Sequence, residues 1–440
     1  MSESSKANSL LLVCLSGPDA GKRMSVTSTT IALGRSTDCE IASDDAGVSD
    51  RHLTLGLKDG RIAFAAVAGG AAFVDGQRME KGTLEPHQQL RIGRSLWQLE
   101  SASRTANSSS SFLGNIGGKI SEIAGVEKIE GFNFSEMFSQ VFRKRTDEEM
   151  ESYFAVGTPT TTPTLAEVEV NWPHPWLFVK IFVLAALTYA GLVFMLREFQ
   201  NPLVLPGLMV IGSFVVPISL LVFFFEVNAA RNVPLYQLLK MLLHGGVLSL
   251  IVTLALYAVT KVGEPVTWGA AVGIGLVEEA GKVAALLLIV NKLKYRWTLN
   301  GLLFGAAVGT GFAVFESAGY AFRLGMENGI SEMLDNITLR GMLCLCGGHV
   351  VWCSLTGAAL WRVRGDRKFE WSMLYDSRFL RVFALAVAMH ATWDAPFEWP
   401  MYMKFIAVGF VGWVAVMSFI QSGLRQILAA QAEAAKPAAA

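Results

Sequence analysis

The sequence predicts two unlike parts, an N-terminal all-β sandwich and a C-terminal all-α polytopic membrane domain of about eight transmembrane helices. Roughly the first 170 residues carry short strand-like stretches broken by Gly, Asp and Ser, whereas long apolar runs dominate the rest. Hydrophobic residues make up 52% of the 440 positions and charged residues only 17%, which excludes a disordered or collagen-like chain. Lys+Arg and Asp+Glu both total 37, so the net charge indicates no nucleic-acid partner.

The sandwich prediction rests on short stretches of strand composition that recur at regular spacing between turn residues. They are residues 10–15, 30–33, 53–57, 61–66, 72–74, 89–92 and 96–100. The first stretch is too short for the apolar core of a secretory signal and lacks a basic flank, so we interpret it as a strand. The cysteines number five, an odd count without zinc-finger spacing, and predict neither a disulfide framework nor a structural zinc site.

The expected domains are a sandwich at 1–105, a linking segment at 106–172, the membrane domain at 173–425 and an Ala-rich disordered tail at 426–440. Within the linking segment, the Ser-rich stretch 101–111 that begins it cannot bury a core. Residues 112–154 are weakly amphipathic and predict short surface helices. The Thr/Pro stretch 158–164 is expected to be extended because of its prolines.

Apolar runs close to the length that spans a bilayer recur from residue 173 onward. Basic residues gather in the loops after the fourth run and after the sixth, a bias that places these loops and both termini in the cytoplasm. We therefore expect an integral protein of a bacterial inner membrane. The predicted spans are residues 176–196, 203–225, 235–257, 266–290, 299–322, 339–363, 379–398 and 403–420.

Four motifs follow one another in the sandwich: Gly-Arg-Ser at 34–36, Val-Ser-Asp-Arg-His at 48–52, Phe-Val-Asp-Gly at 73–76 and Leu-Arg-Ile-Gly at 90–93. In this order they resemble a forkhead-associated (FHA) domain, a module that recognises phosphothreonine. The resemblance implies that Arg35 and Ser49 contact the phosphate and that His52 braces the loop. Gly70 stands where the family usually has an Asn that grips the ligand backbone, which predicts weak or lost binding. The alternative is a sandwich that mediates only protein contacts.

Ionisable residues inside the predicted spans indicate chemistry, because each costs roughly 2.5–3.5 kcal/mol on insertion scales and must be paired or used. Glu278, Glu279 and Lys282 form Glu-Glu-x-x-Lys and share an arc of about 100° on one helix. Two neighbouring carboxylates disfavour double ionisation and a lysine offsets this, so one can act as a base while the other orients it. The alternative is a structural ion pair.

Polar groups also occur in later spans. Glu316 shares a helix face with glycines at 305 and 309, and this ridge predicts close packing that brings the carboxylate into the bundle. His349 follows two glycines. His390 and Asp394 lie one helical turn apart, so the carboxylate can orient the imidazole. A structural hydrogen bond is the alternative role of Glu316, and burial as a hydrogen-bonded histidine is the alternative for the imidazoles.

The order Glu-Glu-x-x-Lys, Gly-Phe-Ala-x-x-Glu, His and His-x-x-x-Asp, each on its own predicted helix, resembles the PrsW family of intramembrane proteases. These are relatives of CAAX-processing and bacteriocin-processing membrane proteases, and the similarity spans about residues 175–420. It implies a peptidase that cleaves membrane proteins, of regulatory or anti-sigma-factor-like type, under control of the FHA domain. The implied catalytic residues are Glu278, Glu279, Lys282, Glu316, His349, His390 and Asp394.

Two reaction schemes fit these residues. In the first, Glu278 or Glu279 is the general base and His349 or His390 stabilises the oxyanion. In the second, a divalent metal such as Zn²⁺ is bound by His349, His390 and a carboxylate, for which Glu316 is the candidate. No His-Glu-x-x-His motif is present, and the interpretation favours the metal-free scheme, although the family is often classed with metalloproteases.

The rival interpretation is a non-catalytic membrane receptor or scaffold that recruits phosphorylated partners through the FHA domain. Such a protein should tolerate the loss of either Glu278 or Glu279, whereas a protease should not. Besides the lipid bilayer and a membrane-protein substrate, the expected partner is a phosphothreonine-containing protein. The protein's own linker at 158–164 is a second candidate, favoured by its high effective concentration.

Overall fold

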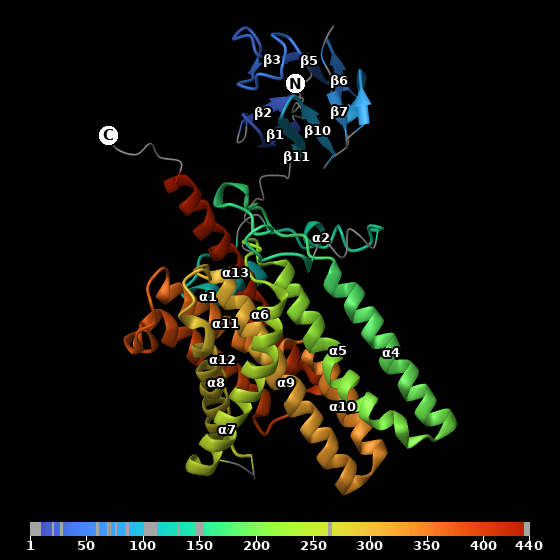
Figure 1. Cartoon of the computed structure of the whole chain (residues 1–440), viewed down its shortest axis with the longest axis vertical. Helices are drawn as coiled ribbons and strands as arrows, with labels where there is room; N and C mark the ends of the chain where they lie inside the picture. Colours follow the sequence, from blue (N-terminus) through green and yellow to red (C-terminus); the bar gives the residue numbers. More distant parts are fainter. Residues whose placement is uncertain are drawn as a thin grey trace, which may run out of the picture. The chain divides into compact units, whose positions relative to one another are not determined.

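A computed structural model describes residues 10–434, except 20–21, 27–29, 59–60, 68–69, 71, 75–76, 85–87, 101–111, 130–131, 147–153 and 263–265. The chain divides into two units, Met1–Ser111 and Phe112–Ala440, which are considered separately (Figure 1). The Ser-rich stretch 101–111, the Asp75-Gly76 part of the third motif and the end of the expected tail lie outside the described residues.

Two β-sheets form the first unit. One has the strand order β2-β1-β11-β10-β7-β8 and the other β4-β3-β5-β6-β9. The strands are β1 Leu10–Ser16, β2 Arg23–Val26, β3 Ile31–Gly34, β4 Ile41–Ala42, β5 Leu53–Lys58, β6 Arg61–Ala66, β7 Ala72–Val74, β8 Gln77–Met79, β9 Lys81–Leu84, β10 Gln89–Ile92 and β11 Ser95–Glu100. Every expected strand is present, and the additional ones, β2, β4, β8 and β9, have two to four residues each.

The core of this unit lies between the two sheets. Leu12 and Trp97 come from one sheet and Leu33, Leu55 and Phe64 from the other, and all five are buried in one apolar cluster. Because alternate residues of a strand point to opposite faces, each sheet contributes one apolar face to this cluster. The all-β sandwich predicted from sequence is confirmed.

Helices make up the second unit. They are α1 Phe112–Ile123, α2 Phe134–Met137, η1 Leu165–Glu167, α4 Leu177–Phe199, η2 Pro202–Val204, α5 Leu205–Glu226, α6 Leu235–Lys240, η3 Met241–Gly245, α7 Gly246–Thr260, α8 Trp268–Val290, α9 Thr298–Asn328, α10 Ile330–Cys344, α11 Gly348–Arg364, η4 Trp371–Tyr375, α12 Ser377–Asp394, η5 Pro400–Tyr402 and α13 Met403–Ala434. Helices α6, η3 and α7 form one continuous rod with a π-helical turn in its middle.

Helix α9 is the centre of the unit, since it packs against α5, α7, α8, α10, α11 and α13 (Figure 1). Its glycine ridge lies directly on α11. A methyl group at Gly305 or Gly309 would collide with the backbone carbonyl of Cys353 or His349. The helices approach as closely as they do because these positions carry no side chain. This contact sets the position of His349.

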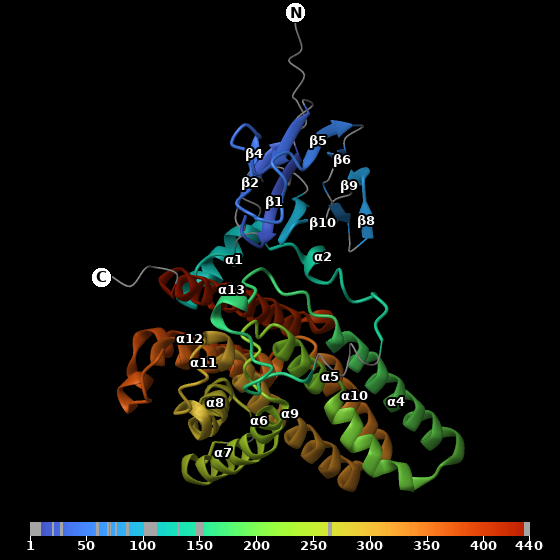
Figure 2. The same ribbon diagram turned by 45° about the horizontal axis from the view of Figure 1, so that its top comes forward.

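Six helical segments of the described chain are long and apolar enough to cross a membrane, so the expected count of about eight is not confirmed. The two predicted spans that fall short correspond to α8 and α12. Each carries three charged residues: Glu278, Glu279 and Lys282 in α8, and Arg378, Arg381 and Asp394 in α12. Both helices nevertheless pack inside the bundle, α8 against α7 and α12, and α12 against α11 (Figure 2).

Much of the segment expected to link the two parts packs on the helical unit. Ile120, Met137 and Val168 are buried in its main apolar core. The end of α13 holds the segment through hydrogen bonds from Gln421 to the Lys128 carbonyl and from Gln431 to the Leu165 and Val168 carbonyls. Helix α13 therefore continues to Ala434, through residues that the sequence had assigned to a disordered tail.

A half-buried carboxylate fixes the start of α4. This helix is largely exposed at the edge of the unit, beside α5 (Figure 1). The Glu226 carboxylate, at the end of α5, accepts hydrogen bonds from the backbone N–H groups of Trp176, Leu177 and Phe178 at 2.7–2.9 Å. These N–H groups have no partner within the helix, and the positive end of the helix dipole favours the negative charge.

Glu226→Gln should therefore loosen α4 from α5. The substitution removes the charge and leaves a single acceptor oxygen, which we expect to cost about 1–3 kcal/mol. Thermal unfolding in detergent and labelling of a cysteine introduced into α4 measure the effect. Glu198→Gln is the matched control, because Glu198 is exposed near the other end of the same helix. Equal behaviour of the two variants would contradict the capping role.

Candidate functional site

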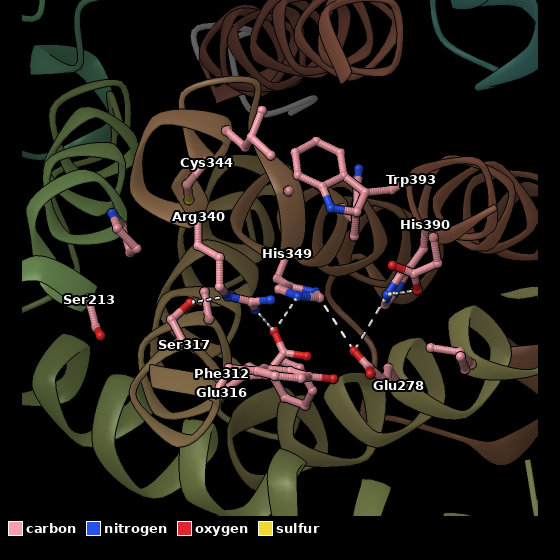
Figure 3. A pocket seen from close by; sticks show the side chains of 18 of the residues that line it. Ser213, Glu278, Phe312, Glu316, Ser317, Arg340, Cys344, His349, His390 and Trp393 are labelled. Carbon is pink, nitrogen blue, oxygen red and sulfur yellow. Dashed lines mark hydrogen bonds and ion pairs between the residues drawn. The ribbon is translucent and has the colours of Figure 1, made fainter. Parts of the chain in front are cut away.

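A cavity of about 740 Å³ opens within the helical unit, lined by residues of α5, α7–α13 and the segment after α7. One part of its wall is apolar, with Leu250, Leu254, Ile274, Leu339 and Leu343 among the lining residues. The other part carries Glu278, Glu316, Arg340, His349, His390 and Asp394 (Figure 3). Polar groups from five helices thus meet beside an apolar chamber.

The pair Glu279 and Lys282, predicted from sequence, lies behind the polar residues that line the cavity. Both side chains are fully buried, and the Lys282 Nζ donates to Glu279 Oε1 at 2.7 Å. The same ammonium lies 2.8 Å from His349 Nδ1 and faces the ring of Phe312 at 4.3 Å. The Lys282 side chain on α8 therefore contacts both α9 and α11. Its cation–π contact with Phe312 stabilises the ammonium without a further anionic side chain.

Glu278 differs from Glu279 in facing the cavity. Its Oε1 accepts a hydrogen bond from the Tyr257 hydroxyl of α7 at 2.8 Å. Its Oε2 is buried and has no hydrogen-bond partner among the described residues, with Lys282 Nζ at 3.7 Å. A buried carboxylate oxygen without a partner is costly, and such an atom calls for an explanation. A water, a cation or a substrate that reaches this oxygen would supply the missing partner.

His349 enters the site at the first turn of α11. The chain passes from α10 to α11 through Gly347 and Gly348, both with positive φ values (111° and 48°), which favour glycine. The His349 Nε2 lies 3.0 Å from Glu316 Oε2, so an Nε2–H that donates to this carboxylate leaves Nδ1 as the acceptor of the Lys282 ammonium. Two opposite contacts therefore define one tautomer of the imidazole.

Glu316 is held from its other side by α10. The Arg340 guanidinium pairs with Glu316 Oε2 and donates to the Ser317 hydroxyl at 3.1 Å (Figure 3). The glutamate predicted from the glycine ridge thus lies between an arginine and an imidazole. Arg340 was not among the predicted site residues. Its position as the second residue of a predicted span was the signal that could have identified it.

His390 completes the group from α12. Its Nδ1 lies 3.0 Å from Glu279 Oε1, and its Nε2 lies 3.5 Å from Glu278 Oε2 and 3.4 Å from Asp394 Oδ2. Two carboxylates facing one ring nitrogen repel its lone pair, so this place needs positive charge. A proton on the imidazole or a cation beside it supplies that charge.

The structure therefore brings all of the predicted catalytic residues into one group, whose members are Glu278, Glu279, Lys282, Glu316, His349, His390 and Asp394. Sequence reasoning missed Tyr257, Arg340 and Trp352. The Trp352 ring packs on His390, with centroids 4.6 Å apart, and on His349 at 5.2 Å. An aromatic residue on the same helix as His349 gave no signal of this role, because aromatic residues are common in membrane helices.

The residues fit a divalent metal. One ligand atom each from Glu278, His349 and His390 lies within 4.8 Å of the others, so the carboxylate of this group is Glu278 where the sequence had suggested Glu316. Tetrahedral zinc with bonds of about 2.0–2.1 Å requires ligand atoms roughly 3.4 Å apart. The Glu278 Oε2 lies 3.5 Å from His390 Nε2 and 3.9 Å from His349 Nδ1. The Lys282 ammonium competes for this His349 nitrogen, so a bound metal requires it to turn fully toward Glu279.

In the N-terminal unit, the loops of the first two motifs are bonded to each other. The Arg35 N–H donates to the Ser49 carbonyl at 2.9 Å, and the Ser49 N–H donates to Nδ1 of the buried His52 at 3.1 Å. The half-exposed Arg35 guanidinium lies 3.2 Å from the Asp50 carboxylate. A Cβ at Gly70 would lie 2.5 Å from the His52 carbonyl oxygen, so this backbone cannot accept the family's usual Asn.

Comparisons with known proteins agree with both halves of this description. Residues 233–420 match the model of the PrsW family of intramembrane metalloproteases. Residues 13–103 match the cytoplasmic domain of an inner membrane component of the type III secretion system. The glycogen accumulation regulator GarA of Mycolicibacterium smegmatis is 30% identical over 89 residues, 20% of this chain and 56% of that protein. The chain thus spans about half the length of this curated relative.

Solved FHA structures resemble the N-terminal unit. An FHA domain from Chlamydia trachomatis is 20% identical, with coverage of 21% of this chain and 98% of that one and a TM-score of 0.20. The cytoplasmic domain of the sorting-platform protein PscD from P. aeruginosa is 21% identical, with coverage of 22% and 84% and a TM-score of 0.21.

The buried Glu279–Lys282 pair predicts a strongly non-additive pair of substitutions. Lys282→Met leaves the Glu279 carboxylate buried without its main partner, and we expect a loss of about 3–5 kcal/mol. Glu279→Gln combined with Lys282→Met removes both charges, so the double variant should be more stable than Lys282→Met alone. Unfolding in detergent with increasing denaturant measures all three. A double variant whose loss equals the sum of the two single losses would show that the pair is not coupled.

Proposed function

We propose that this chain cleaves membrane proteins inside the bilayer under phosphorylation-dependent control. Its residues 233–420 form a PrsW-family intramembrane metalloprotease domain, which follows an FHA-like domain. The observation that carries the proposal is the Glu278 Oε2 oxygen, which makes no hydrogen bond among the described residues and lies 3.5 Å and 3.9 Å from the imidazoles of His390 and His349. Glu278 and both histidines line the cavity. A buried carboxylate oxygen without a hydrogen bond is costly, and a role as general base or metal ligand explains why the chain keeps it.

Glu278 is the general base in this proposal. Glu278 lines the cavity, whereas Glu279 does not and has its Oε1 engaged by Lys282 and His390. Glu278 takes a proton from water as the water oxygen attacks the scissile carbonyl carbon. It returns that proton to the amine nitrogen as the C–N bond breaks, which leaves a free carboxylate and a free amine. Tyr257 holds the other carboxylate oxygen and orients the base.

His390 stabilises the negative charge that develops on the carbonyl oxygen. Glu279 accepts from the Nδ1–H of this ring, so its Nε2 is presented toward Glu278 and Asp394 at the cavity. An Nε2–H in this position can donate to an oxyanion in a site with little water, where a hydrogen bond is worth more than in solution. Lys282 and Trp352 act as positioning residues for the two imidazoles.

The metal-dependent scheme uses the same atoms. A divalent metal such as Zn²⁺ held by Glu278, His349 and His390 would supply Lewis-acid activation of water and of the scissile carbonyl. Glu279 and Glu316 would then fix the tautomers of the two histidines from outside the ligand group, as carboxylates commonly do for metal-bound imidazoles.

The FHA-like unit supplies regulation in this proposal. Arg35 and Ser49 lie on loops joined by hydrogen bonds, where a phosphothreonine would meet one cation and one hydroxyl. Substrate proteins of the regulatory type expected from the sequence, or the protein's own linker, would provide the phosphothreonine. In the linker, Thr158, Thr160 and Thr161 are exposed and bonded to one another, which leaves them accessible to a kinase. We place both termini in the cytoplasm of a bacterial cell, since the kinase must reach them.

Glu278→Gln should abolish cleavage while the protein still folds. The amide cannot accept a proton from water, and a loss of at least a hundredfold in kcat follows if Glu278 is the base. The measurement is cleavage of co-reconstituted single-span membrane proteins in liposomes, followed by mass spectrometry. Glu332→Gln, at an exposed position of α10, is the control and should retain full activity.

Full activity of Glu278→Gln would overturn the assignment of the base, and full activity of Glu279→Gln as well would overturn a glutamate-dependent mechanism. Absence of cleavage by the wild type would favour the receptor or scaffold. Elemental analysis of purified protein separates the two schemes. One zinc per chain, lost together with activity on chelation, supports the metal site, whereas activity that survives chelation argues against it.

Phosphopeptide binding tests the regulatory half. A linker peptide covering residues 155–167 with phosphothreonine at 158 or 161 should bind residues 1–111, and Arg35→Ala should weaken binding roughly tenfold or more because a charge-assisted bond is lost. Arg78→Ala, at an exposed position of β8, is the control. Isothermal titration measures both. If wild type binds the phosphorylated and unphosphorylated peptides equally poorly, the sandwich serves protein contacts only.

A further inference from the structure

Buried polar atoms without a hydrogen-bond partner concentrate around the cavity. In the described part of the helical unit these atoms belong to Ser213, Thr253, Glu278, Glu279, Asn336 and Arg364. Four of these six residues line the cavity: Ser213, Thr253, Glu278 and Asn336. The Glu278 oxygen belongs to the catalytic group, and Thr253 Oγ1 is packed against Gly281 of α8. Ser213 and Asn336 remain without an assigned role.

These two residues lie on neighbouring helices, α5 and α10, which pack tightly where a methyl group at Gly212 would collide with the Ile337 side chain. In Figure 3, Ser213 lies apart from the dashed contacts of the catalytic group, on the side of Arg340. Asn336 precedes Arg340 by one helical turn, so the two side chains share a face of α10. Polar groups therefore extend along α10 beyond the catalytic group, into the wall that is otherwise apolar.

The missing hydrogen bond of Ser213 is informative because another serine on the same helix makes one. A buried serine in an α-helix usually donates to a backbone carbonyl one turn earlier, as Ser219 of α5 does to Val215 at 2.6 Å. Ser213 is 5% exposed and makes no such bond. A buried hydroxyl and a buried amide oxygen without partners each cost about 1–3 kcal/mol. A cavity that keeps both is built to satisfy them with something that enters it.

A substrate that unwinds inside the bilayer brings matching groups. Hydrolysis needs a peptide carbonyl that a water can reach, and a helical segment hides its carbonyls in its own hydrogen bonds. Once unwound, the main chain exposes N–H and C=O groups, and each costs several kcal/mol in an apolar medium unless it finds a partner. An extended strand presents donors and acceptors alternately along its edge.

We propose that Ser213 and Asn336 form a main-chain subsite that holds an unwound stretch of the substrate beside the scissile bond. The Asn336 Oδ1 accepts an N–H of the substrate main chain, and the Ser213 hydroxyl donates to a C=O. The subsite recognises the unwound state and not a particular side chain, so it selects membrane segments that lose helical structure easily. This inference rests on the proposed protease function.

The test compares Ser213→Ala and Asn336→Leu with two controls, Ser219→Ala on α5 and Thr338→Val on α10. Ser219 and Thr338 bond within the protein and do not line the cavity. The probe is a fluorescent single-span peptide of about 20 Leu and Ala residues with a central Gly-Pro break. Its affinity is measured on the Glu278→Gln background in liposomes, and its KM and kcat on the active protein.

We expect Ser213→Ala and Asn336→Leu to weaken peptide binding roughly three- to tenfold and to raise KM by the same factor. Ser213→Ala should leave the unfolding temperature unchanged or raise it, because no bond inside the protein is lost. In a second set of peptides, an ester replaces one amide at a time and so removes one N–H donor. At one position near the break, this replacement should weaken binding to the wild type and leave binding to Asn336→Leu unchanged. The control variants should bind both peptides as the parent does.

Unchanged affinity and KM in both variants, with normal cleavage by the wild type, would overturn the subsite and leave the protease function standing. A large drop in unfolding temperature in Ser213→Ala would also overturn it, since the hydroxyl would then have a structural role. Absence of both binding and cleavage of any membrane peptide by the wild type would overturn the proposed function and the subsite with it.

Discussion

The buried ion pair of Lys282 and Glu279 is the interaction on which the rest of the helical unit depends. Removing two charges from water costs several kcal/mol per ion, and this cost is offset only when geometry and further hydrogen bonds are good. Lys282 meets this condition through Glu279, His349 and the ring of Phe312. Glu279 meets it through Lys282 and His390. These contacts connect α8 with α9, α11 and α12, so satisfying one pair of charges assembles the four helices that carry the site.

Small residues make that assembly possible. The glycines of α9 allow the backbone of α11 to approach, and the collision expected at Gly309 involves the carbonyl of His349 itself. The close contact between α9 and α11 therefore also determines how far the His349 imidazole reaches into the helical unit. After α10 ends at Cys344, the positive φ angles at Gly347 and Gly348 redirect the chain, and α11 begins at the residue before the histidine. Position and direction of His349 thus follow from backbone constraints, and its hydrogen bonds only choose the tautomer.

Helical spacing in the sequence explains only those contacts of the site that lie within one helix. Glu316 was predicted from its glycine ridge, and His349 from the family resemblance. Glu278, Glu279 and Lys282 are related by helical periodicity, as are His390 and Asp394, and their contacts could be expected from spacing. Sequence reasoning missed Tyr257 and Arg340, because contacts between helices leave no periodic signal in a single sequence. The count of about eight spans is not confirmed, for a related reason. Helices α8 and α12 carry the charges of the site, or charges beside it, so the residues that make the helices functional also lower their apparent hydrophobicity.

The balance of charge explains why one arrangement suits two reaction schemes. Among the described residues, the carboxylates of Glu278, Glu279, Glu316 and Asp394 have two permanent cations within ion-pair distance, Lys282 and Arg340. The site is therefore short of positive charge, most clearly where His390 Nε2 faces both Glu278 and Asp394. A proton on the imidazole fills this place in one scheme and a divalent metal in the other. In either scheme, Glu279 fixes the opposite nitrogen of the ring. The carboxylates that α8 brings into the bundle thereby require a positive charge at the catalytic site. The need to compensate buried negative charge therefore determines both the packing of these helices and the chemistry of the site.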